Sequence, residues 1–591
     1  MKLLEGCRTK LDCLHLFPRL PYNYADDNVH PPLQSKTFLS SIMKKILLLL
    51  LFPLSLFAQS LPDSTIKKID SVFRFYTSTT PGCAIAVLKD GEVVFQKGYG
   101  LANMEYAVPI TPNTIFHIAS ESKQYVAFCM LLLEKEGKLS IDDDIRKYLD
   151  YVPDFGYKIT IRQLIHHISG LRDQWQLLAN AGWQLDDVIT QEHVIKLVSK
   201  QKALNSIPGD EYNYCNTGYT LMAEIVKKVS GLTLRQYTDK NIFEPLGMKD
   251  THFHDNYQEI VPNRAYSYSI HPTRRYQNAV LSYSIVGATS LFTTVLDEAK
   301  WLNNYETGKV GGKDLIEKMY QVGVLNNGRK LNYAFAINID TYKGWKQIGH
   351  GGADAGYRTY ACRYPEKGIG IVVFSNLANA DPNGFSRQVA GLLITDTKEE
   401  TKAPENTTYV DSNFSKKLIG KYYSERGDRI EFFWQNGKLM RRNPSGGTNE
   451  VKLSIAGNNR FTTNSNGPAL ILDEKNKSMD SVMEMTLENP TNTIRYKRQP
   501  IVPQKISAEF AGRYYGEETE AFYTIAEKEG KLTLQHRKYN DVPLIYIAPD
   551  QFTLAYWWMS HIRFLRDKKG KIIAFEVNAG RIHRLRYDKV K

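Results

Sequence analysis

The segment FHIASESK, residues 116–123, places an apolar run directly before Ser120 and puts Lys123 three positions after it. The apolar spacing from Lys123 to Glu136 predicts a helix over 123–136, with Ser120 at its first turn. A serine at that place lies near unpaired backbone N–H groups, and a lysine three residues on lies one turn later on the same face. A desolvated lysine that has lost its proton can activate the hydroxyl, so this segment predicts an acylable nucleophile.

The Ser-x-x-Lys pattern has little weight by itself, because it also occurs at Ser41, Ser64 and Ser199. At most such places the serine caps a helix and the lysine is solvated. Only Ser120 combines the pattern with a preceding apolar run and a following helix. The context, and not the pattern, therefore selects Ser120.

Two further segments carry polar groups beside predicted secondary structure. Tyr214 and Asn216 stand just before a helical pattern over 217–229, although a second Tyr-x-Asn at Tyr276 shows that this pattern also arises by chance. The segment HGGA, residues 350–353, precedes a predicted strand. Its small residues would let a bound substrate lie against the strand edge.

Strand patterns occur at both ends of residues 59–398 and helical patterns lie between them. We expect one hairpin over 83–99, turned at Asp90-Gly91, and a second hairpin formed by 357–364 and 369–375. Further helices are expected at 296–305 and 384–395. This order predicts an α+β fold, an antiparallel sheet covered by helices.

With these segments in place, the chain resembles the penicillin-recognising serine hydrolases, the group of class C β-lactamases, D,D-carboxypeptidases, D-aminopeptidases and related esterases. ITIRQLIHHISGL at 159–171 is similar to that group's LLxHxSGL segment, and GKLSIDD at 137–143 is similar to its GKLsLDD turn. The resemblance covers about residues 62–397. It implies a β-lactamase-like fold and a serine hydrolase that works through an acyl-enzyme without a metal or cofactor.

The resemblance also implies roles for individual residues. Ser120 would be the nucleophile, Lys123 its partner in proton transfer, and Tyr214 a general acid and base. Asn216 would hydrogen-bond the substrate. The oxyanion hole would consist of the backbone N–H groups of Ser120 and Ala353, which stabilise the charge of a tetrahedral intermediate.

The segment His350-Gly351-Gly352 departs from the Lys-Thr-Gly that β-lactamases of the group usually carry. We expect these three residues to bind substrate, but the loss of an ammonium and a hydroxyl weakens recognition of a carboxylate. A D-aminopeptidase-like or esterase-like hydrolase is therefore expected first, with a D,D-peptidase or β-lactamase as the alternative. A penicillin-binding sensor or binding protein without turnover is the alternative of another class.

Three aromatic residues near the motifs carry separate expectations. Because an imidazole ordinarily titrates near neutrality, His350 predicts that activity depends on pH around ~6–7. His167 is expected to fix a loop beneath the site. Trp175 fits a pocket lining or a core position equally well.

The N-terminal region has the pattern of an export signal. Lys44 and Lys45 precede an apolar run over 46–58 that ends in a small residue, so residues 43–58 read as a signal peptide. Residues 1–42 would then be a mis-assigned start or a leader. The run is too short to span a bilayer comfortably. We expect an exported protein, periplasmic or extracellular, with no integral membrane span.

The C-terminal region contains a repeat. A polar linker is expected at 399–412, followed by two units at 413–500 and 501–591 in which LIGKYY at 418–423 matches FAGRYY at 510–515. Short alternating runs predict two antiparallel barrel-like β units. They resemble, in architecture, the paired eight-stranded barrels appended to D-aminopeptidase. We expect both units to fold apart from the catalytic domain.

Composition limits the partners. The chain has 591 residues and a net charge of +13, and residues 405–591 hold 31 Lys/Arg against 22 Asp/Glu. Because no long run of like charge and no nucleic-acid motif accompanies them, we expect no nucleic-acid partner. Cys83, Cys129, Cys215 and Cys362 are widely spaced, and no H-E-x-x-H occurs, so we expect buried thiols and no structural metal. The expected partner is a small-molecule or peptide substrate, with cell-envelope peptidoglycan fragments as candidates. The oligomeric state stays open.

Overall fold

The computed structural model describes residues 60–398, 410, 412–442, 448–457, 460–463, 469–472, 481–488, 493–499 and 508–590. All described residues belong to one compact unit of the chain. The expected leader and signal peptide lie outside the described residues, as does the expected linker apart from residues 410 and 412. Within the described part, no helix is both long and apolar enough to cross a membrane.

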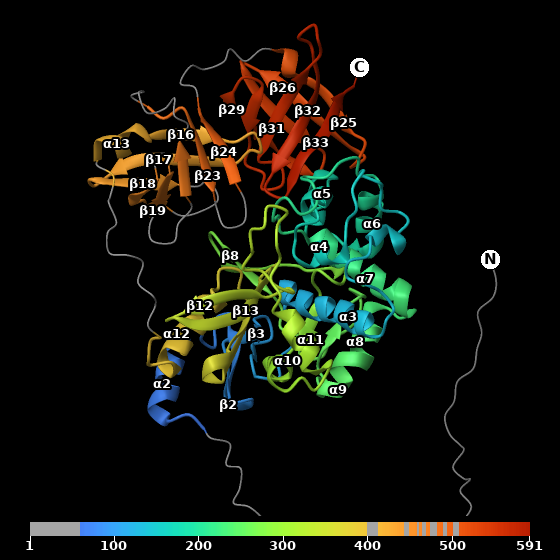
Figure 1. Ribbon diagram of the computed structural model, residues 1–591, viewed down its shortest axis with the longest axis vertical. Helices are drawn as coiled ribbons and strands as arrows, with labels where there is room; N and C mark the ends of the chain where they lie inside the picture. Colours follow the sequence, from blue (N-terminus) through green and yellow to red (C-terminus); the bar gives the residue numbers. More distant parts are fainter. Residues whose placement is uncertain are drawn as a thin grey trace, which may run out of the picture. The chain divides into compact units, whose positions relative to one another are not determined.

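Residues 60–398 are built around a six-stranded antiparallel sheet in the order β12-β13-β14-β15-β1-β2. Figure 1 labels β12, β13 and β2 of this sheet. Cys83 of β1 pairs with Tyr99 on one side and Ser375 on the other, so strands from the two ends of the domain meet in its middle. The six strands are β1 (Cys83–Lys89), β2 (Glu92–Tyr99), β12 (Asn338–Tyr342), β13 (Trp345–Asp354), β14 (Tyr357–Tyr364) and β15 (Ile369–Ser375).

Both predicted hairpins are confirmed. The first turns at Asp90 and Gly91, whose φ angles of 50° and 87° are left-handed, as a tight hairpin turn requires. In the second, the strands pair from Arg358 opposite Ser375 to Tyr364 opposite Ile369. The predicted fold class, an antiparallel sheet covered by helices, is therefore correct.

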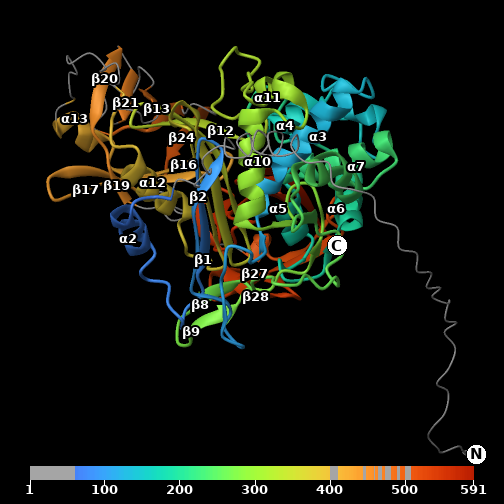
Figure 2. The ribbon, with the colours of Figure 1, turned by 90° about the horizontal axis from the view of Figure 1, so that it is seen from below.

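Helices cover both faces of the sheet. Figure 2 shows α2 (Asp63–Val72) and α12 (Pro382–Leu393) together on one side of β1 and β2, and α10 (Val295–Thr307) on the other. The alternation along β1 explains this, because Ile85 contributes to the buried cluster under α2 and α12, whereas Ala86 contributes to the larger cluster on the opposite face.

The other helices surround the larger cluster. The four predicted helices correspond to α3 (Lys123–Lys135), α7 (Asn216–Ser230), α10 and α12, each within two residues of the expected start. Besides these four and α2, the α-helices of the domain are α4 (Ile161–Ile165), α5 (Gln174–Asn180), α6 (Gln191–Ser199), α8 (Leu234–Thr238), α9 (Glu244–Leu246) and α11 (Gly312–Met319). A small sheet of order β5-β11-β7 uses Phe116–His117, Leu291–Thr293 and His252–Phe253.

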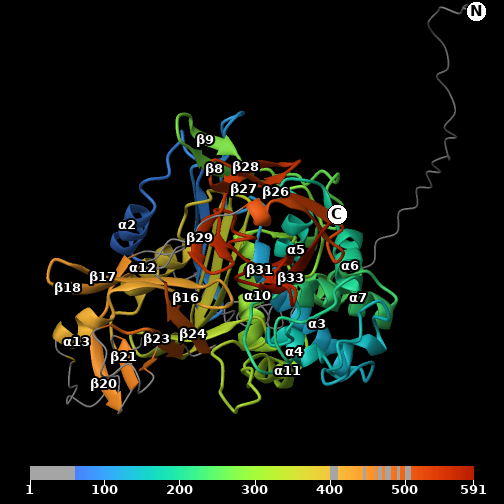
Figure 3. The ribbon, with the colours of Figure 1, turned by 90° about the horizontal axis from the view of Figure 1, so that it is seen from above.

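The C-terminal region forms two nine-stranded antiparallel sheets among the described residues, orange and red in Figure 3. Their orders are β19-β18-β17-β16-β24-β23-β22-β21-β20 and β28-β27-β26-β25-β33-β32-β31-β30-β29, the same order with every number raised by nine. The predicted duplication is thus confirmed in topology, with nine strands per unit instead of eight.

The strand bounds follow the repeat. The first sheet contains β16 (Gly420–Tyr423), β17 (Arg429–Gln435), β18 (Lys438–Arg442), β19 (Thr448–Glu450), β20 (Leu453–Gly457), β21 (Arg460–Thr463), β22 (Ala469–Leu472), β23 (Glu484–Glu488) and β24 (Thr493–Arg498). The second contains β25 (Gly512–Gly516), β26 (Ala521–Lys528), β27 (Lys531–His536), β28 (Tyr539–Pro543), β29 (Ile545–Ala548), β30 (Gln551–Thr553), β31 (His561–Arg566), β32 (Ile572–Ala579) and β33 (Ile582–Lys589).

The repeat extends to single hydrogen bonds. The hydroxyl of Tyr422 in β16 donates to the carbonyl of Leu418 at 3.0 Å, and the hydroxyl of Tyr514 in β25 donates to the carbonyl of Phe510 at 2.8 Å. Each bond joins the first strand of a unit to the short helical turn before it. The matching tyrosines of the two units therefore form equivalent hydrogen bonds.

The expectation that both units stand apart from the catalytic domain is wrong for the second one. Its apolar residues belong to the same buried cluster as α3 and α7. Arg172, with a side chain 1% exposed, forms an ion pair of 2.5 Å with Glu518, which is 7% exposed. A buried apolar and ionic contact of this kind makes the second sheet part of the catalytic domain's core, which a composition-based boundary does not reveal.

The four cysteines among the described residues, Cys83, Cys129, Cys215 and Cys362, are buried and unpaired, as predicted.

Candidate active site

A cavity of about 620 Å³ opens beside the edge of β13, and Ser120, Tyr214, Asn216 and His350 line it. Gly351, Gly352 and Ala353 complete its wall on the sheet side. All residues that the sequence assigned to substrate and oxyanion binding therefore share one cavity. Lys123 lies beneath its floor, fully buried.

Ser120 is held in a strained turn. It belongs to the 3-10 helix Ala119–Ser122, and Ala119 just before it has a φ of +50°, a left-handed conformation that costs energy in a residue with a Cβ. The N–H of Ala119 donates to Nδ1 of His117 at 3.2 Å, which fixes the turn. The hydroxyl of Ser120 is thereby presented to the cavity ahead of α3.

Lys123 occupies the first position of α3 and donates from Nζ to Oγ of Ser120 at 3.0 Å and to the carbonyl of Ala288 at 2.6 Å. Its side chain has no exposure to solvent. Burial is the main reason that the pKa of Lys123 falls to about 7, and Asp354 opposes that shift. At neutral pH a large fraction of the amine is unprotonated and can accept a proton from Ser120.

Tyr214 faces the same pair. The centre of its ring lies 5.1 Å from Nζ of Lys123, and Tyr214 lines the same cavity as Ser120. Burial raises the pKa of Tyr214, an effect that Ser120 partly opposes. The phenol therefore stays protonated, and the geometry allows it to donate a proton next to Ser120 Oγ.

Asn216 is the first residue of α7, and its orientation is set by a residue that the sequence analysis missed. The backbone N–H and Nδ2 of Asn216 both donate to Oδ2 of Asp173, at 2.8 and 2.7 Å. Asp173 also caps α5 through the N–H of Trp175 at 3.0 Å. Trp175 lines the cavity and also packs on Tyr283, with ring centroids 4.9 Å apart. It is therefore both a pocket-lining residue and a packing residue, the two positions expected for it.

The glycine at 352 is required by a close backbone approach. A Cβ there would lie 2.1 Å from the carbonyl oxygen of Ile118 and 2.4 Å from Oγ1 of Thr359. The hydroxyl of Thr359 donates to that same carbonyl at 3.0 Å. Gly352 of β13 therefore packs directly on the backbone before Ser120, and Thr359 of β14 bonds to the same carbonyl.

His350 and His167 are linked through a third residue, Tyr333. Nε2 of His350 lies 3.1 Å from the Tyr333 hydroxyl, and Nε2 of His167 lies 3.2 Å from it. Nδ1 of His350 donates to the carbonyl of Gly351 at 2.7 Å, and Nδ1 of His167 accepts from the N–H of Cys215 at 3.0 Å. His167 thus fixes the loop that carries Tyr214, as predicted.

The expectation that His350 titrates near neutrality is wrong. Burial, and next the charge of Lys123, lower its pKa to about 4. The same two causes lower the pKa of His167. Both imidazoles are therefore neutral throughout the physiological range. A short motif does not show how deeply the folded chain buries its histidine.

Two charged residues of the cavity wall gave no signal in the sequence. Asp354 follows Ala353 on β13, and burial raises its pKa to about 6. Arg581 comes from the turn between β32 and β33, and its guanidinium lies 4.8 Å from the Tyr214 ring and 4.0 Å from Asp173. The second C-terminal sheet therefore supplies part of the cavity.

The chance matches to the motifs lie elsewhere. Ser64 is exposed on α2, and Ser199 ends α6 with its hydroxyl bonded to the carbonyl of Lys196. Neither lines the cavity that contains Ser120, nor does Tyr276 of β9 (Arg275–Asn278). Ser41 lies outside the described residues.

A buried lysine bonded to a serine, with a protonated tyrosine beside them, is an arrangement for acyl transfer. The sequence profile of the family described as Beta-lactamase matches residues 69–395, so the chain belongs to this family. It is a serine hydrolase of the penicillin-recognising type, as the resemblance implied.

The chain is similar to a D-aminopeptidase from Brucella anthropi, with 22% identity over 527 residues that cover 86% of this chain and 96% of that protein. A second D-aminopeptidase from Brucella anthropi is 27% identical over 302 residues, 50% of this chain and 56% of that one. Among solved structures, the octameric penicillin-binding protein homologue from Pyrococcus abyssi has 27% identity and a TM-score of 0.51, covering 73% of this chain and 99% of that chain.

Proposed function

We propose that this protein is a hydrolase of the D-aminopeptidase type, which cleaves the amide bond of a D-aminoacyl substrate through an acyl-enzyme on Ser120. The observation that carries the proposal is the 3.0 Å contact between Ser120 Oγ and the buried Lys123. The similarity to D-aminopeptidases along 86% of the chain supports the choice of substrate class.

In the first step, unprotonated Lys123 accepts the Ser120 proton while Oγ bonds to the amide carbonyl carbon. Charge on the carbonyl oxygen is stabilised by the backbone N–H groups of Ser120 and Ala353. Collapse of this intermediate breaks the C–N bond, and the leaving nitrogen receives a proton from the Tyr214 hydroxyl, which Lys123 restores. The product of the step is an ester on Ser120 and a free amine.

Hydrolysis of the ester reverses these roles. A water gives a proton to the same base and attacks the ester carbonyl, and Ser120 Oγ leaves with a proton. Asn216 is held by Asp173 and would orient the substrate amide. Gly351 and Gly352 leave the edge of β13 open for backbone contacts with the substrate.

The charges of the cavity favour a substrate with a free amine. His350 is neutral and its Nδ1 proton is already bound to Gly351, so it offers no cation to a β-lactam carboxylate. Two arginines line the cavity. Arg581 lies against Asp173 and the Tyr214 ring, and Arg358 donates to the backbone carbonyls of Ala355 and Tyr357. Asp354 at the cavity wall provides a carboxylate for an ammonium group.

The decisive experiment compares four substrate types on one enzyme preparation: D-aminoacyl amides, their L enantiomers, D-Ala-D-Ala peptides and a cephalosporin. We expect the D-aminoacyl amides to have the highest kcat/KM and Ser120→Ala to be inactive on all four. Faster cephalosporin hydrolysis would favour a β-lactamase. A stable adduct with no turnover on any of them would favour the sensor instead.

Export of the mature protein, with processing before Gln59, is part of the same proposal. It is supported by the basic and apolar pattern of residues 43–58. N-terminal sequencing of secreted material is the test, and retention of residues 1–42 would contradict it.

A further inference from the structure

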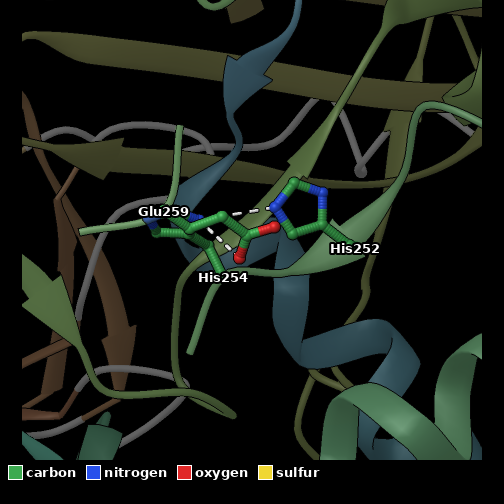
Figure 4. A group of neighbouring side chains, drawn as sticks. All are labelled: His252, His254 and Glu259. Carbon is green, nitrogen blue, oxygen red and sulfur yellow. Dashed lines mark hydrogen bonds and ion pairs between the residues drawn. The ribbon is translucent and has the colours of Figure 1, made fainter. Parts of the chain in front are cut away.

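Three side chains of metal-ligating types meet at a place separate from the cavity of Ser120. His252, His254 and Glu259 point toward one another, as Figure 4 shows, and their nearest ligand atoms all lie within 4.8 Å of one another. His254 is buried and the other two are half-buried. None of the three lines the cavity that contains Ser120.

The local sequence explains the convergence. His252 and Phe253 form β7, an edge of the small sheet β5-β11-β7, and residues two apart on an extended chain project to the same side. Phe292 of β11 supports both imidazoles, with ring centroids 5.8 Å from His252 and 4.6 Å from His254. The chain then turns back and returns Glu259 to the same side.

The separations fit a single ion. Nε2 of His252 lies 3.4 Å from Nδ1 of His254, and that nitrogen lies 3.9 Å from Oε2 of Glu259. Neighbouring ligand atoms of a tetrahedral zinc site with bonds of about 2.0–2.1 Å are roughly 3.3–3.4 Å apart. The two histidines, which hydrogen-bond each other, already have this spacing. The distance of 3.9 Å is too long for a hydrogen bond between His254 and Glu259.

Arg235 of α8 is the outer partner of the carboxylate. Its Nη1 and Nη2 donate to the two oxygens of Glu259 at 2.5 and 2.9 Å, and Nη1 also contacts Asp255 at 3.3 Å. Each carboxylate oxygen has a second lone pair, so this fork holds Glu259 in place and still leaves a ligand position free. The charge of Arg235 opposes a cation, and Asp255 offsets it.

Glu259 also lines a cavity of about 670 Å³, whereas neither histidine does. Because Glu259 is half-buried, solvent can reach the carboxylate side of the group.

From this geometry we propose that His252, His254 and Glu259 form a Zn²⁺ site. Two imidazoles and one carboxylate are a ligand set that zinc accepts, with one position left for water. The sequence expectation of no metal rested on cysteine spacing and on the missing H-E-x-x-H, and it did not weigh a His-x-His on a strand. The proposal does not depend on the proposed function.

The bound ion would stabilise the fold around the nucleophile without entering the reaction. Phe292 packs on His254 and also on His117, at 5.3 Å. His117 in turn holds the N–H of Ala119, the residue before Ser120. Zinc would therefore tie the Glu259 loop to β7, an edge strand of the sheet that positions the nucleophile turn.

The test uses the full chain without a histidine tag, stripped with a chelator and then titrated with Zn²⁺ or Co²⁺. We expect about one zinc per chain by mass spectrometry, a cobalt absorption spectrum of tetrahedral type, and a rise in melting temperature with added zinc. His254→Gln and Glu259→Gln should each weaken zinc binding by at least ~10-fold, since even outer partners of a metal are worth 10–100-fold. His271→Gln, a histidine at the end of β8 (Tyr268–His271), should bind zinc as the native chain does.

Two results would overturn the site. One is a native chain that takes up less than ~0.1 zinc at micromolar metal and shows no change in melting temperature. The other is unchanged zinc affinity in Glu259→Gln, which retains the shape of the side chain and a bond to Arg235 and so should fold even if His254→Gln does not.

Discussion

The hydroxyl of Tyr333 lies 3.1 Å from Nε2 of His350, in a chain of hydrogen bonds whose direction is set by the backbone groups at its two ends. Nδ1 of His350 donates to Gly351, so its Nε2 must accept from Tyr333. Tyr333 then accepts from Nε2 of His167, whose Nδ1 accepts from Cys215. A single ordered chain of neutral groups thus connects the strand at one wall of the cavity to the loop that carries Tyr214.

Tyr333→Phe should break this chain at its centre. Both histidines would lose a buried partner, which costs about 1–3 kcal/mol for each unsatisfied group, and Tyr214 would be held less firmly. We expect a lower melting temperature and a kcat reduced by ~10-fold or more with a smaller change in KM. Tyr276→Phe, on the hairpin β8–β9, is the control. Native kcat in Tyr333→Phe would contradict the positioning role.

Removal of the catalytic groups should have graded effects. Ser120→Ala should abolish labelling by a fluorophosphonate, and Lys123→Ala and Tyr214→Phe should each lower kcat by ~10²–10⁴, the usual contribution of a positioned proton-transfer group. Ser64→Ala provides a matched control, because Ser64 also begins a Ser-x-x-Lys but is exposed on α2. Labelling of Ser120→Ala at the native rate would refute the assignment.

The pH dependence should follow Lys123 and not His350. The pKa of Lys123 is lowered to about 7, so the amine accepts a proton only above that pH, and kcat/KM should rise through about pH 7 to a plateau. The pKa of His350 is about 4, so His350→Asn should reduce activity without moving this midpoint. A midpoint that shifts by more than ~1 pH unit in His350→Asn would show that His350, and not Lys123, is the group whose titration controls activity.

The second C-terminal sheet should be required for a stable catalytic domain. Glu518→Ala would leave Arg172, only 1% exposed in its side chain, buried without its partner, which typically costs about 3–5 kcal/mol. Its neighbour Glu517 pairs with Lys202 at the surface, with 69% of its side chain exposed, so Glu517→Ala should leave the calorimetric melting temperature unchanged. Equal melting temperatures of the two variants would show that the buried pair contributes nothing.

The sequence predicted the parts of the site that lie within one element. Ser120 and Lys123 are one helical turn apart, and Tyr214 and Asn216 flank a helix start, so local periodicity locates them. Arg581 could not be found in this way, because it meets α5 across a sequence separation of 405 residues, through the bond from its N–H to Gln176. Only the docking of the second sheet brings it to the cavity.

The pKa values of the site residues were the other property that the sequence did not predict. The motif alone predicts that His350 titrates near neutral pH. In the fold, burial beside Lys123 lowers its pKa to about 4. The sheet itself was easier to predict. Its hairpins consist of continuous apolar runs bounded by turn residues, because helices cover both faces of strands such as β1 and β15.

One buried acid predicts how stability depends on pH. Burial is the first cause that raises the pKa of Glu298 on α10 to about 7, and its Oε2 accepts from the Tyr125 hydroxyl at 2.7 Å. Glu121, next to Ser120, is equally buried and has its pKa raised by burial and by Glu298. The folded chain therefore holds protons that the unfolded chain releases above about pH 4.5.

The sign of the effect follows from this difference. The contribution of Glu298 to stability is fully present below the unfolded pKa of about 4.5 and is lost as pH rises through the folded value of about 7. Glu298→Gln keeps an acceptor for Tyr125 and has no proton to lose, so it should be more stable than the native chain at pH 8 by about 1–3 kcal/mol, and similar to it at pH 4.5. Melting curves at both pH values test this, with Glu317→Gln, exposed on α11, as the control. A native chain that is as stable as Glu298→Gln at pH 8 would mean that the carboxyl is ionised in the fold at no cost.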